Sequence, residues 1–571
     1  MLNKLYFKLC IVAINRIGTV QSKPALSLLL MVAMQSASAQ IGHWAFSSKG
    51  LPLYEYEGAL PFKAVDKEGK DALQPEDPYF LIGNYRLALF THASGIYQLI
   101  TAERAWARLN ASPERPNYGW NEASVVFKNN KVNLKTVLTG VRSIAANKSL
   151  VKKEFGVGFA RYFYTLNNDV ACTRIISAKP SMKIHTGNPS FVVTVVLKNK
   201  GKKAQDLSYS ERMLVNYVLN STQYTKPQKR PLAHEVAINI NDEKETGIAN
   251  ISARANTFLV LPRKEERFVY DVAPPSVFMY TGNSGEKRSV EIQSSKDTLT
   301  AQIDLSLKPG ETKSFHIVIG IADGENFIDV QKQVKDLFYG ADLKNPAEGL
   351  FAEQWKKRLP DLSDEKNIIL RREMLWNAHM VEASAKYSDY YKETFIPQGS
   401  VYSYYYGDNI SNRDHLQAAL PACYTNPELA KSAIRYVIKH SERDGEIKRG
   451  NYSGYGYTPP SLYKESDPQL YFFNTISEYL RITGDYDFLN EAVDYYPVEE
   501  GKKDPVITML KKYFIYLRDE VGTGPNGLVR ILNSDWSDSF FHNYSPNKYS
   551  GSAESHLNSA MVLAVFPKLI D

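Results

Sequence analysis

The stretch KPGETKSFHIVI, residues 308–319, marks the place where the pattern of the chain changes. Lys308–Thr312 contains the proline and glycine of a tight turn, and Lys313–Ile319 is a β-rich run that predicts a strand. Upstream, from Phe80 to about Leu307, short runs rich in Val, Ile, Tyr and Phe alternate with polar turns. Downstream, from Glu365, apolar residues recur at three- and four-residue steps. The stretch therefore ends a predicted β region that precedes a predicted α region.

The upstream runs predict a large antiparallel β-sandwich, because many short strands punctuated by turns are typical of that architecture. We expect strands at Tyr85–Phe90, Ser124–Phe127, Phe191–Leu197, Ala237–Ile240, Phe258–Leu261 and Ser289–Gln293.

The downstream pattern predicts a helical region. Glu325–Tyr339 and Phe351–Arg358 suit a linker with one or two helices. Three of the expected later helices begin at a proline, where a missing N–H is least harmful. The six helices expected are Ile368–Tyr387, Arg413–Cys423, Pro427–Ser441, Pro468–Ile482, Pro505–Arg518 and Ser552–Phe566.

The chain has 571 residues, which exceeds one ordinary core and predicts two or more domains. The boundaries that fit the patterns are 1–39 for a signal peptide, 40–320 for the β-sandwich, 321–364 for the helical linker and 365–571 for the helical domain.

The N-terminus has the order of parts of a secretory signal. Four basic residues precede a short apolar run, Ala25–Met34, and Ala37–Ala39 is a small-residue cleavage site that would leave Gln40 first. The run is too short to span a bilayer as an ordinary helix. We expect a periplasmic or secreted protein with no membrane insertion after cleavage. A buried helix of the folded domain is the alternative.

Composition excludes several classes of protein. Loss of the four basic residues of the predicted signal lowers the formal charge from +7 to +3, with no Lys/Arg stripe, so no nucleic-acid partner is expected. Cys172 and Cys423 would remain, which is too few for a disulfide framework, and no Cys/His spacing suits zinc. We interpret both cysteines as packing residues and predict no metal site.

Two distant stretches carry the chemistry. Asn412–Pro421 contains the pair Arg413–Asp414, and Asp535–Asp538 reads Asp-Trp-Ser-Asp. Guanidinium and carboxylate groups form hydrogen bonds with sugar hydroxyls, and aromatic rings stack on the apolar faces of sugars. A carboxylic acid beside an indole can stay protonated near neutral pH, as acid catalysis of glycosidic cleavage requires. These stretches predict a carbohydrate-active enzyme. An Asx turn at Asp535 and Asp538, or a helix start at Arg413–Asp414, is the structural alternative.

These motifs make the chain resemble glycoside hydrolase family 94, the cellobiose and chitobiose phosphorylases, and more loosely the wider group of (α/α)6-barrel glycosidases. The resemblance implies a galactose-mutarotase-like supersandwich followed by a helical linker and a six-hairpin barrel, of which residues 365–571 supply only the first half. The matching segments, in chain order, are Tyr79–Tyr85, Ala93–Tyr97, Arg413–Pro421, Ser466–Asp467, Glu478–Leu480, Thr483–Asp485, Gly524–Leu528 and Asp535–Asp538.

The resemblance also implies roles for individual residues. Asp538 matches the general acid of the family, which protonates the glycosidic oxygen as the bond breaks with inversion. Trp536 would pack on a sugar, and Arg413 and Asp414 would hold hydroxyls of the sugar that is attacked. Asp535 is a further substrate-binding candidate. Ser537 stands where the family has asparagine, which puts contacts of that amide in doubt.

The function expected from all this is an exported inverting glycoside hydrolase that cleaves a β-linked glucan or related oligosaccharide. Phosphorolysis of a β-linked disaccharide is the alternative, with inorganic phosphate as co-substrate and no other cofactor. Export favours hydrolysis, because known phosphorolytic relatives usually work in the cytoplasm. A non-catalytic carbohydrate-binding remnant also stays open, since no base or phosphate site is visible before Asp571. A lyase fits the motifs poorly. An oligosaccharide or polysaccharide is the expected partner, and a homodimer is left open.

Overall fold

The computed structural model describes residues 42–57, 79–102, 107–113, 119–128, 133–139, 149–218, 234–252, 274–281, 291–324, 326–338, 342–397, 410–448, 450–451, 464–537 and 552–570. The chain divides into two compact units, Met1–His43 and Trp44–Asp571, and the fold below is that of the second unit. The predicted signal peptide, residues 1–39, and the predicted strand Phe258–Leu261 lie outside the described residues.

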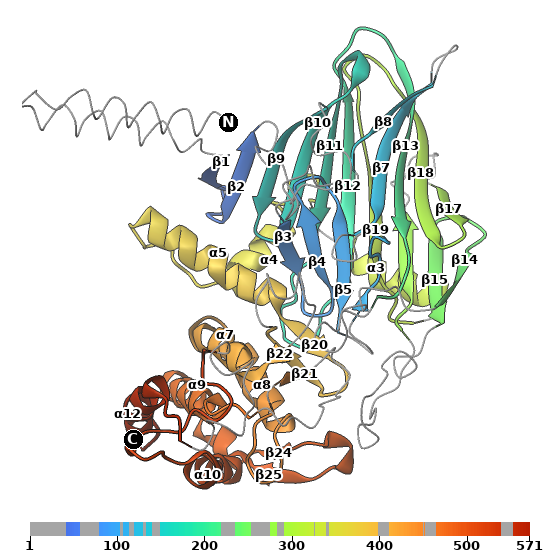
Figure 1. Ribbon diagram of the computed structural model, residues 1–571. Coiled ribbons are helices and arrows are strands. Elements are labelled where there is room, and N and C mark those ends of the chain that lie inside the picture. Colours follow the sequence, from blue (N-terminus) through green and yellow to red (C-terminus); the bar gives the residue numbers. More distant parts are fainter. Residues whose placement is uncertain are drawn as a thin grey trace, which may run out of the picture. The chain divides into compact units, whose positions relative to one another are not determined.

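Three sheets make up the β region (Figure 1), and every strand pair with a described register is antiparallel. The largest sheet has ten strands, in the order β1-β2-β9-β10-β11-β12-β19-β16-β15-β14. Their bounds are β1 Gly42–Phe46, β2 Pro52–Glu57, β9 Leu150–Gly156, β10 Phe159–Thr165, β11 Val170–Ser177, β12 Ser190–Asn199, β19 Thr312–Ile321, β16 Val277–Thr281, β15 Thr246–Ser252 and β14 Glu235–Ile240.

The second sheet has five strands and the third has four. The five-stranded sheet is ordered β17 Glu291–Ser295, β18 Thr298–Leu307, β13 Gln205–Leu214, β7 Asn121–Phe127 and β8 Leu134–Val137. The four-stranded sheet is ordered β3 Tyr79–Gly83, β4 Ala88–His92, β5 Tyr97–Thr101 and β6 Ala107–Arg108.

The central strand β12 shows why the two larger sheets form a sandwich. Val193 and Val195 join one apolar core with Leu207 and Tyr209 of the five-stranded sheet. Val192, which points to the other face, packs in a second cluster with residues of helix α3, Phe327–Phe338. A strand buried on both faces reads as a continuous apolar run, and β12 does so.

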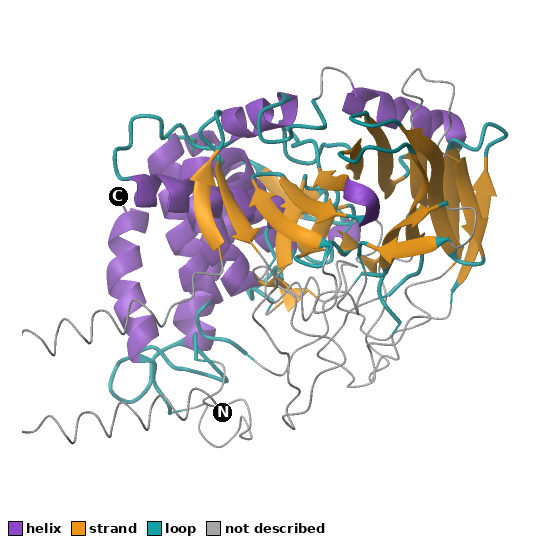
Figure 2. Cartoon of the chain, turned by 90° about the horizontal axis from the view of Figure 1, so that it is seen from above, coloured by secondary structure: helices purple, strands orange, loops and turns teal. Residues whose placement is uncertain are grey.

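The helical region follows, as the change of pattern at residues 308–319 predicted, and Figure 2 shows helices and strands in contrasting colours. Its helices are α4 Leu350–Arg358, α5 Ile368–Ser384, α7 Asn412–Thr425, α8 Pro427–Lys439, α9 Pro468–Thr483, α10 Val506–Tyr516 and α12 His556–Ile570. A π-helical turn, η5 Leu517–Val521, continues α10. Three 3-10 turns are η1 Asn167–Asp169, η3 Tyr486–Asn490 and η4 Val498–Glu500.

Three two-stranded sheets, two of them hairpins, lie among these helices in the described residues. They are formed by β20 Lys386–Ser388 with β21 Glu393–Phe395, by β22 Ile410–Ser411 with β23 Gly450–Asn451, and by β24 Ala492–Asp494 with β25 Lys503–Pro505. Apolar residues of α7, α8, α9, α10 and α12 share one core. The predicted β-plus-α architecture, with an antiparallel sandwich before a helical region, is confirmed.

Several predicted boundaries are wrong by a few residues, among them the last helix, expected over Ser552–Phe566 and observed at His556–Ile570. The helix expected over Ile368–Tyr387 ends at Ser384, because Lys386–Ser388 pairs with β21 and the Tyr387 N–H donates to the Tyr85 carbonyl at 2.8 Å. The strand expected at Tyr85–Phe90 begins at Ala88. Cys172 and Cys423 are both buried and unpaired by a disulfide, as packing residues should be. Within the described ranges, no helix has the length and apolarity that a membrane span requires.

Candidate active site

Arg413 brings the two sequence motifs together. It lies in the first turn of α7, and its Nη1 donates to the backbone carbonyl of Asp535 at 2.8 Å, across 122 residues of sequence. The same nitrogen lies 3.2 Å from Oδ2 of Asp467. The Arg413 side chain is only 5% exposed, so its described contacts are with protein groups. The guanidinium therefore anchors the start of the Asp-Trp-Ser-Asp segment to α7.

Asp467 is the buried carboxylate of this cluster. It occupies the N-cap position of α9, yet its side chain does not cap the helix and turns to Arg413 instead. Its Oδ1 has no hydrogen-bond partner in the part of the chain that the structure describes. Burial raises the pKa of Asp467 to about 6, although the charge of Arg413 acts in the opposite direction. A carboxyl group with this pKa changes its protonation state near neutral pH.

The segment before α9 and the segment before Asp535 run side by side. Glu465 and Ser534 form a parallel bridge, and the Ser466 N–H donates to the Ser534 carbonyl at 3.0 Å. Asn558, in the first turn of α12, donates from Nδ2 to the Ser466 hydroxyl at 2.8 Å. These bonds tie the start of α9 and the start of α12 to the segment that leads into Asp535. The position of that segment is therefore set by three elements.

Asp535 itself is held by an Asx turn. Its Oδ1 accepts from the Ser537 N–H at 2.8 Å, and its Oδ2 accepts from the Ser555 hydroxyl at 2.6 Å. Ser555 also caps α12, because its hydroxyl accepts from the Asn558 N–H at 3.0 Å. Asp535 is buried, and both carboxylate oxygens have protein partners. The Asx turn that the sequence offered as an alternative to substrate binding accounts for the described contacts of Asp535. These contacts orient the residues just before Asp538.

Residues next to Arg413 and Asp535 in the chain, and one on α9, carry groups suited to a sugar. Trp536 is 59% exposed, so its indole is accessible for stacking. Asp414 is half-buried in the first turn of α7. Tyr471 on α9 is also half-buried, and burial followed by the charge of Asp467 raises its pKa to about 12, so its hydroxyl stays protonated. A hydrogen bond with the Gln417 side chain lowers the pKa of the same hydroxyl, and so partly opposes these two effects.

The predicted general acid, Asp538, lies outside the described residues. Of the four predicted site residues that are described, Arg413 and Asp535 are joined by a hydrogen bond, and Asp414 and Trp536 are their neighbours in the chain. Their roles toward a substrate stay predictions. The Tyr-rich segments Tyr402–Tyr406 and Tyr452–Tyr457, and Asp408, also lie outside the described residues.

Three other ionisable residues, His379, Glu382 and Glu554, make structural contacts. His379 is fully buried, its Nε2 accepts from the Gly158 N–H at 3.0 Å, and burial lowers its pKa to about 3. Glu382 is buried and pairs with Arg358. Glu554 accepts from the N–H groups of Asn526 and Leu528, at 2.9 and 3.2 Å, and so braces the turn before the Asp-Trp-Ser-Asp segment.

Sequence reasoning did not single out Asp467, Tyr471 or Ser555 as site residues. Asp467 was noted only as part of a matching segment, and an aspartate before a helix-starting proline is normally interpreted as a cap. The absence of that cap bond is visible only in the structure. Tyr471 and Ser555 carry no sequence signal of their own, because their relevance comes from neighbours far away in the chain.

Comparisons with known proteins agree with the geometry. Residues 377–571 match the profile described as the glycosyl hydrolase 94 superfamily, catalytic domain, and this range contains the whole cluster. Solabiose phosphorylase from Paenibacillus borealis is 26% identical over 243 residues, which is 41% of this chain and 27% of that protein. The chain thus spans about a quarter of the length of this curated relative.

Solved structures show weaker likenesses. A structure described as a kojibiose phosphorylase from the human microbiome is 11% identical, with a TM-score of 0.46, covering 86% of this chain and 62% of that one. A galactose mutarotase-like protein from Lactobacillus casei is 6% identical, with a TM-score of 0.23, over 43% of this chain and 100% of that one. Both scores lie below 0.5, so the fold assignment rests on the observed elements. The resemblance to glycoside hydrolase family 94 that the motifs predicted is confirmed, and residues 377–571 are the part that matches the catalytic domain of this superfamily.

Proposed function

We propose that the protein is an inverting glycoside phosphorylase that cleaves a β-linked disaccharide or short oligosaccharide with inorganic phosphate. Hydrolysis was the first expectation from the sequence, because a predicted signal peptide favoured export. The matches to a phosphorylase and to the family 94 catalytic domain support phosphorolysis instead. The β linkage and the identity of the sugar remain expectations from the motifs.

The observation that carries this proposal is the bond from Arg413 to the Asp535 carbonyl. It brings the Arg-Asp pair of α7 against the segment that contains Trp536 and leads to Asp538. A general acid must stand within hydrogen-bond reach of the glycosidic oxygen, so the segment before it needs a fixed path. Arg413, Ser555 and the Asx turn of Asp535 supply that path.

The proposed reaction requires three roles of the chain. Asp538 gives its proton to the glycosidic oxygen as the bond to the anomeric carbon breaks. Phosphate attacks that carbon from the opposite face and forms a sugar 1-phosphate of inverted configuration. Trp536 packs on a sugar face, and Asp414 accepts bonds from sugar hydroxyls. Arg413 holds the segment Asp535–Asp538 in place and does not bind the phosphate, because its guanidinium is buried among protein groups.

The test is a cleavage assay on β-linked disaccharides with and without phosphate. We expect a sugar 1-phosphate to form only when phosphate is present, and no free reducing sugar above background without it. Reducing sugar released equally in both conditions would contradict phosphorolysis and restore the hydrolase. The reverse reaction, release of phosphate from a sugar 1-phosphate and an acceptor sugar, provides a second readout.

A non-catalytic carbohydrate-binding protein is the competing function, and Asp538 separates the two. Asp538→Asn keeps the shape of the side chain but removes the acid. An enzyme should lose turnover by about two to four orders of magnitude while it keeps ligand affinity. A binding protein should show no turnover in either form. Ser537→Asn, which restores the residue that the family has at this position, is a useful neighbour variant that should keep turnover.

Export to the periplasm or beyond is a further part of the proposal. It rests on the basic residues, the apolar run and the cleavage site within residues 1–39. N-terminal sequencing of the protein from its native host should begin at Gln40. A sequence that begins at Met1 would contradict cleavage. Sedimentation of the same material would test the homodimer that the sequence leaves open.

A further inference from the structure

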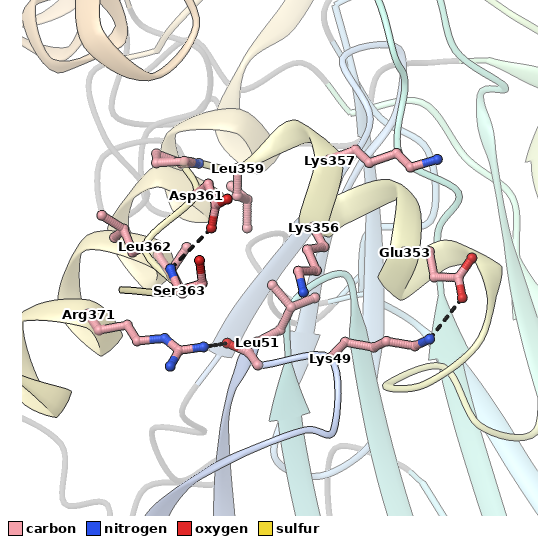
Figure 3. A pocket seen from close by; sticks show the side chains of 13 residues that line it. Lys49, Leu51, Glu353, Lys356, Lys357, Leu359, Asp361, Leu362, Ser363 and Arg371 are labelled. Atoms are coloured by element: carbon pink, nitrogen blue, oxygen red, sulfur yellow. Dashed lines mark hydrogen bonds and ion pairs between the residues drawn. The ribbon is translucent and has the colours of Figure 1, made fainter. Parts of the chain in front are cut away.

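A pocket of about 500 Å³ lies where the turn between β1 and β2 meets α4 and α5 (Figure 3). Its lining comes from the turn at Lys49–Leu51, the end of α4, the connection Leu359–Ser363 and the first turns of α5. It shares no residue with the cluster around Arg413. A volume of this size is within the range of pockets that bind small organic ligands.

The lining is rich in positive charge. Of its four cations, only Lys49 has an ion pair in the described ranges, to Glu353 at 2.8 Å. Asp361 is the second carboxylate of the lining: its Oδ1 accepts from the Ser363 N–H at 3.1 Å, and the Ser363 hydrogen bonds, followed by the charges of Lys356 and Arg371, lower its pKa. The pocket therefore has two more cations than carboxylates among its lining residues. Among the described residues, no carboxylate lies within 4.0 Å of the other three cations, Lys356, Lys357 and Arg371.

Arg371 has unused hydrogen-bonding capacity at the pocket. Its Nη2 donates to the Gly50 carbonyl at 3.3 Å, and its guanidinium lies 5.3 Å from the centre of the Phe46 ring. Its buried Nε has no hydrogen-bond partner among the residues described here. These contacts give Arg371 a structural function at the β1–β2 turn, but they leave donors of its planar fork for an anion.

Lys356 has no such structural function. It is exposed, and no hydrogen bond or ion pair holds it in the described structure. In Figure 3 its side chain points toward Leu51, between the side chains of Arg371 and Lys49. The side chain of Lys357 points away from those of Lys356, Arg371 and Leu51. Lys356 and Arg371 are therefore the two cations best placed to share one anionic group.

An apolar wall completes the pocket. Leu51, Leu359 and Leu375 are buried and belong to one cluster with Trp355, and Leu362 packs against it. Cations beside an apolar wall suit a ligand that has an anionic group and a body with C–H faces. A free inorganic anion would use the cations and leave the wall unused.

We propose that this pocket binds a small anionic sugar, in which a phosphate or carboxylate group lies between Lys356 and Arg371 and the sugar ring rests against Leu51 and Leu359. The site is separate from the catalytic cluster, and the proposal does not depend on the reaction that the cluster performs. Because the pocket is open to solvent, the attraction is screened by salt, and affinity should fall as ionic strength rises.

The first experiment measures protection of Lys356 from an amine-reactive reagent, by mass spectrometry on the full chain. The probes are glucose 1-phosphate, glucuronate, glucose and inorganic phosphate at equal millimolar concentration. We expect the two anionic sugars to protect Lys356 and the neutral sugar not to do so. The stronger of the two anionic sugars identifies the anion. Protection by inorganic phosphate equal to that by glucose 1-phosphate would overturn the sugar part of the proposal, and no protection by any probe would overturn the site.

Affinity measurements on variants test the same site independently. Lys356→Gln and Arg371→Gln should each weaken binding of the protecting sugar by about tenfold, the loss expected for one charge-assisted hydrogen bond. Lys511→Gln on α10, an exposed lysine away from the pocket, is the matched control and should bind like the unaltered chain. Lys356 is exposed, so its variant should fold even where the Arg371 variant does not. Equal affinity in Lys356→Gln and the unaltered chain would contradict the proposal.

The two proposals can fail separately. Asp538→Asn should abolish cleavage and leave the protection of Lys356 unchanged, because the pocket and the cluster have no residue in common. Loss of protection in Asp538→Asn would instead show that the ligand binds at the catalytic site and that Lys356 responds indirectly.

Discussion

Arg174 and Glu211 form a buried ion pair in the β-sandwich, and Arg413 and Asp467 form another in the helical region. The first pair is bidentate, at 2.7 and 3.0 Å, and both side chains are fully buried. Tyr209 also donates to the Glu211 carboxylate at 2.7 Å, and Arg174 donates to the Gly95 carbonyl at 2.8 Å. Every polar atom of this pair has a partner within the described structure.

The second pair is less completely satisfied. Arg413 Nη1 lies 3.2 Å from Oδ2 of Asp467, and Oδ1 of Asp467 has no partner in the described ranges. Burial raises the pKa of Asp467 to about 6. Buried polar groups are normally fully paired, and exceptions gather at functional sites. The difference teaches that one pair is fully satisfied by protein groups in the described structure, whereas the other leaves an acceptor of Asp467 open, as expected of the candidate site.

The largest effect is expected where the complete pair is broken. Glu211→Ala would leave Arg174 buried without a counter-charge, and it should lower the free energy of unfolding by about 3–5 kcal/mol in urea titrations. Glu291→Ala removes an exposed partner of Lys244, 3.5 Å away, and should change stability by less than about 1 kcal/mol. A Glu211 variant as stable as the Glu291 variant would remove the contrast between the two buried pairs.

The pH dependence of Asp467 is the next largest effect. Its pKa of about 6 lies above the ordinary 3.8, so folding favours the protonated form. The resulting stabilisation is fully present below pH 3.8 and is lost as the pH rises through 6, an amount of about 3 kcal/mol. Unfolding free energies measured between pH 4 and 7 should fall more in the unaltered chain than in Asp467→Asn.

Asp485 provides a control of opposite sign for that measurement. Lys431 and Tyr479 donate to its carboxylate and lower its pKa. Its contribution is present above the ordinary pKa and is lost as the pH falls through the lowered value. Asp485→Asn should therefore remove a decrease in stability at acid pH. Identical pH profiles for Asp467→Asn and the unaltered chain would contradict the assignment of Asp467.

A smaller loss is expected from Ser555→Ala. The change removes the hydroxyl that donates to Asp535 and caps α12, which should lower the free energy of unfolding by about 2 kcal/mol. Turnover should fall as well, since the path of the segment before Asp538 loses a support. Ser477→Ala is the control, because the buried Ser477 hydroxyl on α9 has no partner in the described residues. A stability loss without any change in turnover would limit Ser555 to a capping role.

The smallest stability effect is expected at Trp536, and it would sharpen the comparison most. The indole is 59% exposed, so Trp536→Ala should change the free energy of unfolding by less than about 0.5 kcal/mol. Affinity for the sugar, measured by titration calorimetry with the substrate found in the cleavage assay, should fall about tenfold. Tyr486→Ala, at a 63% exposed aromatic residue on η3, should change neither quantity. Unchanged sugar affinity in Trp536→Ala would exclude stacking on this ring.

Local patterns predicted the elements of the fold well. The period of three and four residues after Glu365 predicted six helices, and each is present within a few residues of its expected bounds. The helix that stops furthest short of its expected end, α5, does so because Lys386 and Tyr387 pair with Tyr85 and Thr394, which lie elsewhere in the chain. A periodic pattern contains no information about such a competing partner, so the end of α5 was overestimated.

The sequence by itself determined the order of the β and α regions, five of the six expected helix starts to within one residue and the residue types of the two motifs, because each depends on neighbours within a few positions. Only the tertiary structure decided that Arg413 bonds to the Asp535 carbonyl, that Asp467 faces Arg413 instead of capping α9, and that Lys356 and Arg371 share a pocket. These relations join residues that are distant in the chain. Their proximity follows from how helices and sheets pack, which no local pattern encodes.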